Sequence, residues 1–201
     1  MVIINPLVKE DIYKLSLLPK IKDIFTLLIV GGSQGATIFD NNLKNSIISI
    51  SKKTTLKIIH QTNENNISNL SNFYSKHNID NKIFSFDKNF HTIIHQSDLC
   101  ITRAGASTLA ELSVLKIPFI AVPLPTSKDN HQLENANFYK NNNCCWIIDQ
   151  NFFEEKIEQI LEEILNEKTD YQKKKENLKK INYQNTWNNV NQKILEYINE
   201  N

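Results

Sequence analysis

Glycine and arginine are both scarce in this chain, and the few that it has stand close together. Four of the 201 residues are glycine, about 2% against a usual 7%. Gly31, Gly32 and Gly35 share one loop, and Gly105 lies in a second. Arg103, the single arginine, is two residues before Gly105, and the chain otherwise uses lysine for positive charge. This concentration indicates two loops where the backbone, or a planar guanidinium, has a particular task.

Cysteine, net charge and long apolar runs are also limited. The three cysteines, Cys100, Cys144 and Cys145, are odd in number and lack the spacing of metal ligands, which favours a reduced cytosolic compartment. A formal charge of +1 excludes nucleic-acid binding by bulk electrostatics. No run of about 18 apolar residues exists to span a membrane. The first six residues lack the charged-then-apolar layout of a signal peptide.

The sequence also lacks the side-chain groupings that hold metals. It contains no Asp-x-Asp pair and no cluster of His, Cys and Asp with metal-ligand spacing, and no residue stands out as a general base. We therefore expect no metal, no cofactor and no catalytic residue in this chain. An anionic ligand would be stabilised by helix N-termini and by Arg103.

Apolar runs alternate with amphipathic segments along the whole chain. They predict strands at 25–30, 56–60, 83–86, 99–102, 118–122 and 145–148, and helices at 37–51, 64–76, 89–96, 130–141 and 152–166, with a further helix that follows the turn after residue 102 and ends at about 115. Continuous apolar runs are typical of strands buried on both faces. The alternation predicts an α/β fold, a Rossmann-like open parallel sheet of about six strands with helices on both faces. In such sheets ligands bind at the carboxyl ends of the strands, so both glycine loops should meet at one edge.

The chain divides into three parts by composition. Residues 1–24 are short apolar pieces broken by Pro6 and Pro19, and they form a linker segment. Residues 25–166 form the α/β domain, and 167–201 form a polar, helical C-terminal tail. We expect one domain with an appended arm.

Residues 102–111 predict a strand end, a tight turn and a helix N-terminus, the geometry that presents free backbone N–H groups to an anion. Arg103 at this turn fits bidentate recognition of phosphate or carboxylate. Glu111 lies four residues after Ser107 and three after Thr108, on one helix face, where it suits the two hydroxyls of a ribose. The alternative is a capping box, in which Thr108 and Glu111 satisfy backbone donors.

The other glycine loop is not the dinucleotide fingerprint, because its glycines have a different spacing. It is not a P-loop either, because it lacks Gly-Lys-Ser/Thr. Its small residues, with the Ser33 hydroxyl and the Gln34 amide, suit the close approach of a diphosphate or sugar. The alternative is an ordinary turn with Ser33 as helix N-cap.

His131 and Gln132 open a helix after a proline-bounded loop, and both groups suit sugar hydroxyls. Alternatively they are surface polar residues behind a capping Asp129 or Asn130. His60, at a strand end, favours a structural interpretation over a ligand.

Together these motifs resemble one family. Gly-Gly-Ser-Gln-Gly-Ala, His-Gln, Thr-Arg-Ala-Gly-Ala-Ser-Thr-Leu-Ala-Glu, Ile-Pro-Phe-Ile-Ala-Val-Pro-Leu-Pro and Asp-Asn-His-Gln-x-x-Asn-Ala occur in order between about residues 5 and 150. They are similar to the MurG family, the undecaprenyldiphospho-muramoylpentapeptide N-acetylglucosaminyltransferases. The resemblance covers the C-terminal, donor-binding half of that two-domain GT-B fold. The family's N-terminal half, with its acceptor site and membrane-facing patch, has no counterpart in this sequence.

The resemblance implies a role for each motif residue. Ser33 and Gln34 would lie near the donor diphosphate and sugar, and Glu111 would bind the ribose. His131 and Gln132 would bind N-acetylglucosamine hydroxyls. Arg103 would hold the nucleotide together with the backbone of Gly105, Ala106, Ser107, Thr108, Leu109 and Ala110. The backbone around Asp87 would contact the uracil.

The sequence departs from the family pattern at two places. The family usually has an apolar residue at the position of Asp87. It also usually has Gly-Asn-Pro-Val-Arg where this chain has Ile4-Asn5-Pro6-Leu7-Val8. Lys9 would replace the missing arginine as a point charge, but not as a planar fork.

The resemblance implies an inverting, metal-independent transferase that passes N-acetylglucosamine from its UDP donor to the lipid-linked muramoyl-pentapeptide in peptidoglycan synthesis. It would act peripherally at the cytoplasmic face of the bacterial plasma membrane, and this chain alone would be soluble and bind donor without efficient turnover. The alternatives are the donor subunit of a split transferase with a separate acceptor chain, and a non-catalytic sugar-nucleotide-binding remnant. A nucleotide-sugar epimerase is disfavoured because it needs catalytic acids within this half.

Overall fold

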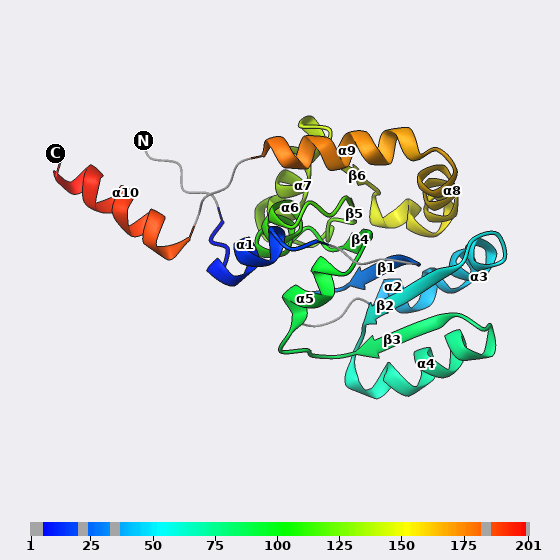
Figure 1. The fold of residues 1–201 in the computed structure, drawn as a ribbon. Helices are drawn as coiled ribbons and strands as arrows, with labels where there is room; N and C mark the ends of the chain where they lie inside the picture. The colour runs from blue at the N-terminus through cyan, green and yellow to red at the C-terminus, as the bar shows by residue number, and fades with distance from the viewer. Residues whose placement is uncertain (1–5, 20–23, 33–36, 182–185, 200–201) are drawn as a thin grey trace.

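The computed structural model describes residues 6–19, 24–32, 37–181 and 186–199. A six-stranded parallel sheet, in the order β3-β2-β1-β4-β5-β6, forms its centre (Figure 1). The strands are β1 (Phe25–Val30), β2 (Leu56–Gln61), β3 (Asp80–Phe84), β4 (Leu99–Thr102), β5 (Phe119–Ala121) and β6 (Cys145–Ile147). The predicted fold class, an open parallel sheet of about six strands, is confirmed.

Helices connect the strands and cover both faces of the sheet (Figure 1). The α-helices are α1 (Glu10–Ser16), α2 (Thr37–Asn42), α3 (Lys44–Ser51), α4 (Ile67–Lys76), α5 (Phe90–His95), α6 (Ala106–Val114), α7 (His131–Asn141), α8 (Phe153–Asn166), α9 (Lys168–Lys180) and α10 (Trp187–Asn199). Short 3-10 turns, η1 (Glu64–Asn66), η2 (Lys128–Asn130) and η3 (Gln150–Phe152), precede α4, α7 and α8.

The two faces of the sheet form two separate parts of the core. Leu28 and Val30 of β1 pack with α1, α5, α6 and α7, whereas Leu27 and Ile29 pack with α2, α3, α4 and α8. Neighbouring residues of a strand point to opposite faces, so a strand covered on both sides needs apolar residues at every position. The continuous apolar run at 25–30 has this cause.

The observed elements differ from the expected ones at three places. The predicted helix 37–51 is two helices that meet at the fully buried Leu43. The third strand begins at Asp80 rather than at 83, because it is an edge strand that pairs only with β2 and does not need a continuous apolar run. The segment expected to be a linker contains α1, whose Ile12 is fully buried.

The C-terminal tail contains two helices with different surroundings. Helix α9 packs on the domain through the buried Tyr171 and Leu178. Helix α10 lies away from the sheet in Figure 1, and its Trp187 is 68% exposed. In the described part of the chain, no helix combines the length and the apolar character that crossing a membrane requires.

Candidate functional site

The strand order reverses between β1 and β4, and both glycine loops leave the sheet there. From β1 the chain proceeds outward to β2 and β3, and from β4 it proceeds in the other direction to β5 and β6. Val30 and Thr102 are register partners at the two strand ends, and the Arg103 N–H donates to the Val30 carbonyl at 3.3 Å. The loops therefore begin side by side at the position where open α/β sheets bind ligands. This confirms that they meet at one edge, although Ser33 and Gln34 lie outside the described residues.

The space above both described loop glycines is open. Apart from the atoms of its two chain neighbours, a Cβ built on Gly32 or on Gly105 would meet no heavy atom within 4 Å. Gly32 has a φ of +84°, a backbone conformation that side-chain-bearing residues rarely adopt. A ligand thus has room to approach the backbone closely at the ends of β1 and β4.

The N-terminus of α6 is not capped by a side chain. Gly105 is its N-cap residue, and among the residues that the structure describes no side chain accepts a hydrogen bond from the first turn. The capping-box alternative for Thr108 and Glu111 is therefore wrong, because the helix begins at Ala106 and Thr108 is already inside it. The backbone N–H groups of Ala106, Ser107 and Thr108 have no intrahelical acceptor, which is the arrangement that binds anions.

Leu109 and Ala110 contribute differently from the first turn. Both are fully buried, and the Leu109 N–H donates to the Gly105 carbonyl at 3.1 Å. These two residues fix α6 against the core and offer no free N–H group to a ligand at this turn.

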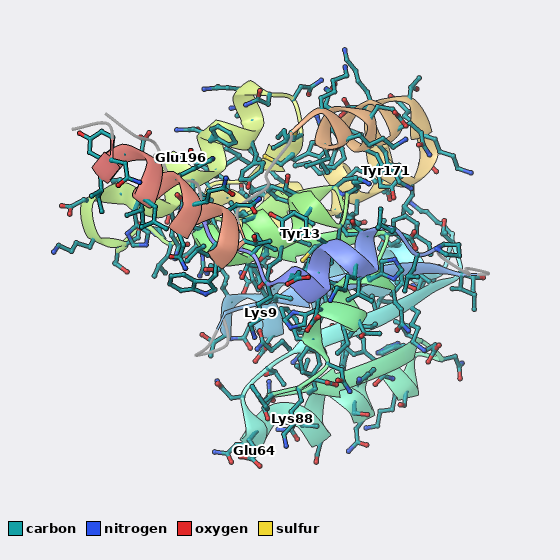
Figure 2. All side chains as sticks on the ribbon, turned by 60° about the vertical axis from the view of Figure 1, so that its left-hand side comes forward. Lys9, Tyr13, Glu64, Lys88, Tyr171 and Glu196 are labelled. Carbon is teal, nitrogen blue, oxygen red and sulfur yellow. The ribbon has the colours of Figure 1, made fainter. Side chains whose placement is uncertain are left out.

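Glu111 lies on α6, one turn after the exposed Ser107. Burial raises the pKa of its carboxyl above the usual value, and the positive charge of Lys9 partly offsets this. Figure 2 shows Lys9 next to α1, which packs against α6. Within the described residues the Glu111 carboxylate has no hydrogen-bond or ion-pair partner, so its oxygens are available to hydroxyl donors.

Gln132 has a fixed amide orientation. Its Oε1 accepts the backbone N–H of Ala104 at 3.2 Å and that of Leu124 at 3.0 Å. Three residues further along α7, Asn135 donates its amide to the Ala104 carbonyl at 3.0 Å. The two side chains attach α7 to the turn before α6. Because the Gln132 oxygen is held by two donors, its NH₂ group faces away from them and offers hydrogen-bond donors.

His131 begins α7 after two left-handed residues, Asp129 (φ 52°) and Asn130 (φ 54°). Asn130 is the N-cap by position, but its side chain makes no capping hydrogen bond. The His131 Nδ1 lies 2.7 Å from the Lys128 carbonyl oxygen, so this nitrogen carries the proton and donates. In the neutral ring Nε2 is then a free acceptor on an exposed side chain. Backbone strain of this kind concentrates at ligand sites.

Arg103 is engaged with the protein and not directed as a free fork into solvent. Its Nη1 donates to the carbonyls of Val122 at 3.1 Å and Pro123 at 3.4 Å. Its Nη2 donates to Oε1 of Gln150 at 2.6 Å. Partial burial lowers the pKa of the guanidinium, which nonetheless stays charged at neutral pH.

Asp87 lies after β3, at the edge strand, two strands away from β1. Its carboxylate accepts the Asn89 N–H and pairs with Lys82, both at 2.8 Å, and these contacts lower its pKa. The side chain is thus used locally, which leaves the backbone for any ligand contact. Next to it, Phe86 is 78% exposed and presents an aromatic face that belongs to none of the sequence motifs.

A buried polar network around α2, the helix after the first glycine loop, was not predicted from the sequence. The Asp40 carboxylate, on α2, accepts the Thr62 hydroxyl at 2.6 Å and the Asn66 amide at 2.8 Å. His60 Nε2 lies 3.1 Å from the other Asp40 oxygen, off the angle of a hydrogen bond, and His60 Nδ1 lies 3.1 Å from the Tyr74 hydroxyl. The structural interpretation of His60, which is fully buried, is confirmed. The network holds α2, the helix after the loop, against the end of β2.

A largely apolar hollow lies beside the proline loop. Its volume is about 460 Å³ when the space open to solvent is included, and Gln150 forms part of its wall. Its remaining lining is Pro123, Leu124, Pro125, Asn130, Leu133, Ile147 and Asp149.

These features define a doubly wound α/β domain whose ligand loops leave the sheet where the strand order reverses. Residues 26–189 match the model of the glycosyltransferase family 28 C-terminal domain. The chain belongs to this family.

Relatives and solved structures agree with this assignment. Over 200 residues the chain is 46% identical to the UDP-N-acetylglucosamine--N-acetylmuramyl-(pentapeptide) pyrophosphoryl-undecaprenol N-acetylglucosamine transferase of Pelagibacter ubique, covering 99% of this chain and 56% of the relative. A crystal structure of Acinetobacter baumannii MurG superposes with a TM-score of 0.78 at 24% identity, covering 89% of this chain and 55% of that one. The chain spans about half the length of the curated relatives it matches.

The likeness extends to a more distant enzyme. A UDP-GlcNAc 2-epimerase from Neisseria meningitidis, solved bound to UDP-GlcNAc, superposes with a TM-score of 0.59 at 17% identity, covering 90% of this chain and 46% of that one. At this identity the likeness concerns the fold alone, that of one half of a GT-B protein.

Proposed function

We propose that this chain is the UDP-N-acetylglucosamine-binding half of an inverting, metal-independent glycosyltransferase that acts on lipid-linked muramoyl-pentapeptide in peptidoglycan synthesis. The observation that carries the proposal is that the two loops are adjacent where the strand order reverses. Open space lies above Gly32 and Gly105, and the α6 N-terminus that follows Gly105 and precedes Glu111 has no side-chain cap. The 46% identity to the Pelagibacter transferase over the whole chain supports the substrate.

The site residues have complementary tasks in this proposal. The free N–H groups of Ala106 to Thr108, at the positive end of the α6 dipole, bind the diphosphate, with Ser33 and Gln34 on its other side. The Glu111 carboxylate accepts the ribose hydroxyls. His131 and Gln132 bind the sugar, one as an acceptor through Nε2 and the other as a donor through its NH₂. The backbone at Asp87 contacts the uracil.

The departing diphosphate is stabilised by fixed dipoles in this mechanism. Helix N-termini supply oriented N–H groups that need no reorganisation as negative charge develops on the leaving group. The half-buried Arg103 fixes the turn from which the N–H groups of α6 project. These groups take the place that a divalent cation has in metal-dependent transferases.

The acceptor half lies outside this chain in the proposal. An N-terminal domain, on this chain's parent protein or on a partner chain, binds the lipid-linked acceptor at the cytoplasmic face of the plasma membrane and supplies the general base. This chain by itself binds the donor and does not transfer the sugar at an appreciable rate.

Thermal unfolding with and without nucleotide tests donor binding. At 100 times its dissociation constant UDP-N-acetylglucosamine should stabilise the fold by about 2.7 kcal/mol, which raises Tm by roughly 5–10 °C. EDTA should leave this shift unchanged. Glu111→Gln should reduce it, whereas the matched control Glu155→Gln, on the exposed face of α8, should not. No shift with UDP or with the UDP-sugar, in the presence or absence of Mg²⁺, refutes the proposal.

A transfer assay tests the division of labour. Labelled donor and the lipid-linked acceptor are incubated with the chain alone. Rapid formation of labelled product would contradict the assignment of this chain to the donor half only.

A further inference from the structure

The contacts of the single arginine extend to three other elements around the switch point. From the turn after β4, the Arg103 guanidinium reaches the Val122 and Pro123 carbonyls after β5 and the Gln150 amide oxygen in η3. Its carbon atom Cζ also lies 5.4 Å from the centre of the Phe39 ring, on α2. Helix α2 follows the first glycine loop, so one side chain joins the surroundings of both loops.

Both terminal nitrogens of the guanidinium are engaged with the protein. Nη1 and Nη2 together make three hydrogen bonds to protein oxygens. The end-on edge between these two nitrogens, one of the two edges that bind a phosphate bidentately, is therefore occupied, and only the side edge with Nε remains. All these acceptors are neutral oxygens, and within the described residues no carboxylate pairs with Arg103.

The same turn is held from its other side by α7. The Ala104 N–H donates to Gln132 and the Ala104 carbonyl accepts from Asn135. The residue before it, Arg103, is attached by its own side chain to the loop after β5 and to η3. The backbone between Arg103 and Gly105 is thus fixed by side chains from two directions immediately before the free N–H groups of α6.

We propose that Arg103 is a positioning residue for the donor site rather than a phosphate ligand. Its guanidinium fixes the turn that carries the α6 N-terminus relative to the β5 loop and α2, and it acts on the nucleotide through that backbone. This inference rests on the proposed function and departs from the bidentate phosphate contact that the sequence suggested.

The partner Gln150 makes the inference testable, because it has no place in the donor-binding machinery. Affinities for UDP and for uridine are measured by titration calorimetry, directly and by competition, well below the Tm of each variant. A ligand to the diphosphate affects UDP alone. A residue that positions α6, which carries both the diphosphate N–H groups and Glu111, affects UDP and uridine together.

We expect Arg103→Met to weaken UDP and uridine by a similar factor, about tenfold. Arg103→Lys keeps the positive charge but has a single nitrogen in place of the planar guanidinium. It should recover less than half of the lost affinity on a logarithmic scale. Gln150→Leu should reproduce part of the effect, about threefold, and adding it to Arg103→Met should cost nothing further, since the shared contact is already gone. Gln150→Glu, which retains an oxygen acceptor, should bind nearly as the parent does. The matched control Gln159→Leu, on the exposed face of α8, should be silent.

The opposite pattern would overturn the inference. If Arg103→Met weakens UDP but not uridine, and Gln150→Leu has no effect, the guanidinium contacts the diphosphate directly. If neither substitution alters either affinity, Arg103 has no part in the site. Failure of the parent protein to bind UDP at all is a different result, which refutes the proposed function itself.

Discussion

Replacing Gln132 by glutamate separates the two tasks that its amide performs. The oxygen accepts the N–H groups of Ala104 and Leu124 at 3.2 Å and 3.0 Å, and glutamate keeps an oxygen in that place. A carboxylate accepts stronger hydrogen bonds than an amide, which offsets the cost of partly burying its charge. We therefore expect the free energy of unfolding at neutral pH to change by less than about 1 kcal/mol.

The same substitution removes the only donor that Gln132 can offer to a sugar. In the proposed complex it replaces NH₂ by a negatively charged oxygen next to the sugar and diphosphate. A lost hydrogen bond and the added repulsion should weaken UDP-N-acetylglucosamine by about 1.5–3 kcal/mol, roughly 10–100-fold. Binding of UDP, which lacks the sugar, should fall less. Urea unfolding and calorimetric titration with both ligands measure the two effects.

Gln132→Met provides the contrast, because it removes the oxygen as well. The N–H groups of Ala104 and Leu124 then lose their acceptor, and each unsatisfied buried group costs about 1–3 kcal/mol of stability. Methionine should thus destabilise the fold and weaken binding, whereas glutamate should only weaken binding. If the glutamate variant binds the UDP-sugar as tightly as the parent, or is destabilised as much as the methionine variant, the assigned amide orientation is wrong.

Three further predictions follow from buried groups. Glu111→Gln should stabilise the free protein at neutral pH, because burial raises the Glu111 pKa and so disfavours its charged form. In urea unfolding from pH 7 to pH 4, the parent should gain stability relative to the variant as the carboxyl is protonated, and a constant difference would contradict this. Asp40→Asn should lower the free energy of unfolding by about 2–4 kcal/mol, since the carboxylate accepts hydrogen bonds from Asn66 in η1 and from Thr62 directly after β2. The Asp40 pKa is lowered, so its contribution to stability is complete above the unfolded-state pKa and disappears as the pH falls through the folded-state value; an unchanged acid-unfolding midpoint in the variant would refute this. Burial raises the thiol pKa of Cys144 to about 11, of Cys145 to about 12 and of Cys100 further still, so a thiol reagent at pH 8 should label none of them until the protein unfolds, and rapid labelling of the native protein would show that this side of the sheet opens.

Several features could be predicted from the sequence because their causes are local. The strands at 25–30 and 99–102 were predicted at their observed bounds, since burial on both faces requires a continuous apolar run. The meeting of the two glycine loops at one edge follows from the alternation of strands and helices alone. The predicted start of the edge strand β3 was three residues too late. This strand has only one neighbour, so it does not need apolar residues at every position.

The bounds of a helix decided the capping question in a way that spacing could not. Thr108 and Glu111 have the separation of a capping box, and the motif is identical whether the helix begins at 106 or after 108. The observed start at Ala106 places Thr108 within the first turn and leaves the N–H groups free. One turn of difference in the start of a helix exchanges a structural role for a binding role.

The sequence by itself determined the order of the elements and the edge of the sheet where its scarce glycines and its arginine gather, because hydrophobic periodicity and chain direction are properties of neighbouring residues. Only the tertiary structure decided what those side chains touch. The acceptors of Arg103 come from residues 19 to 47 positions away, and the donors to Gln132 come from 8 and 28 positions away. Such partners are brought together by the packing of β4, β5 and α7, and no local pattern in the chain encodes them.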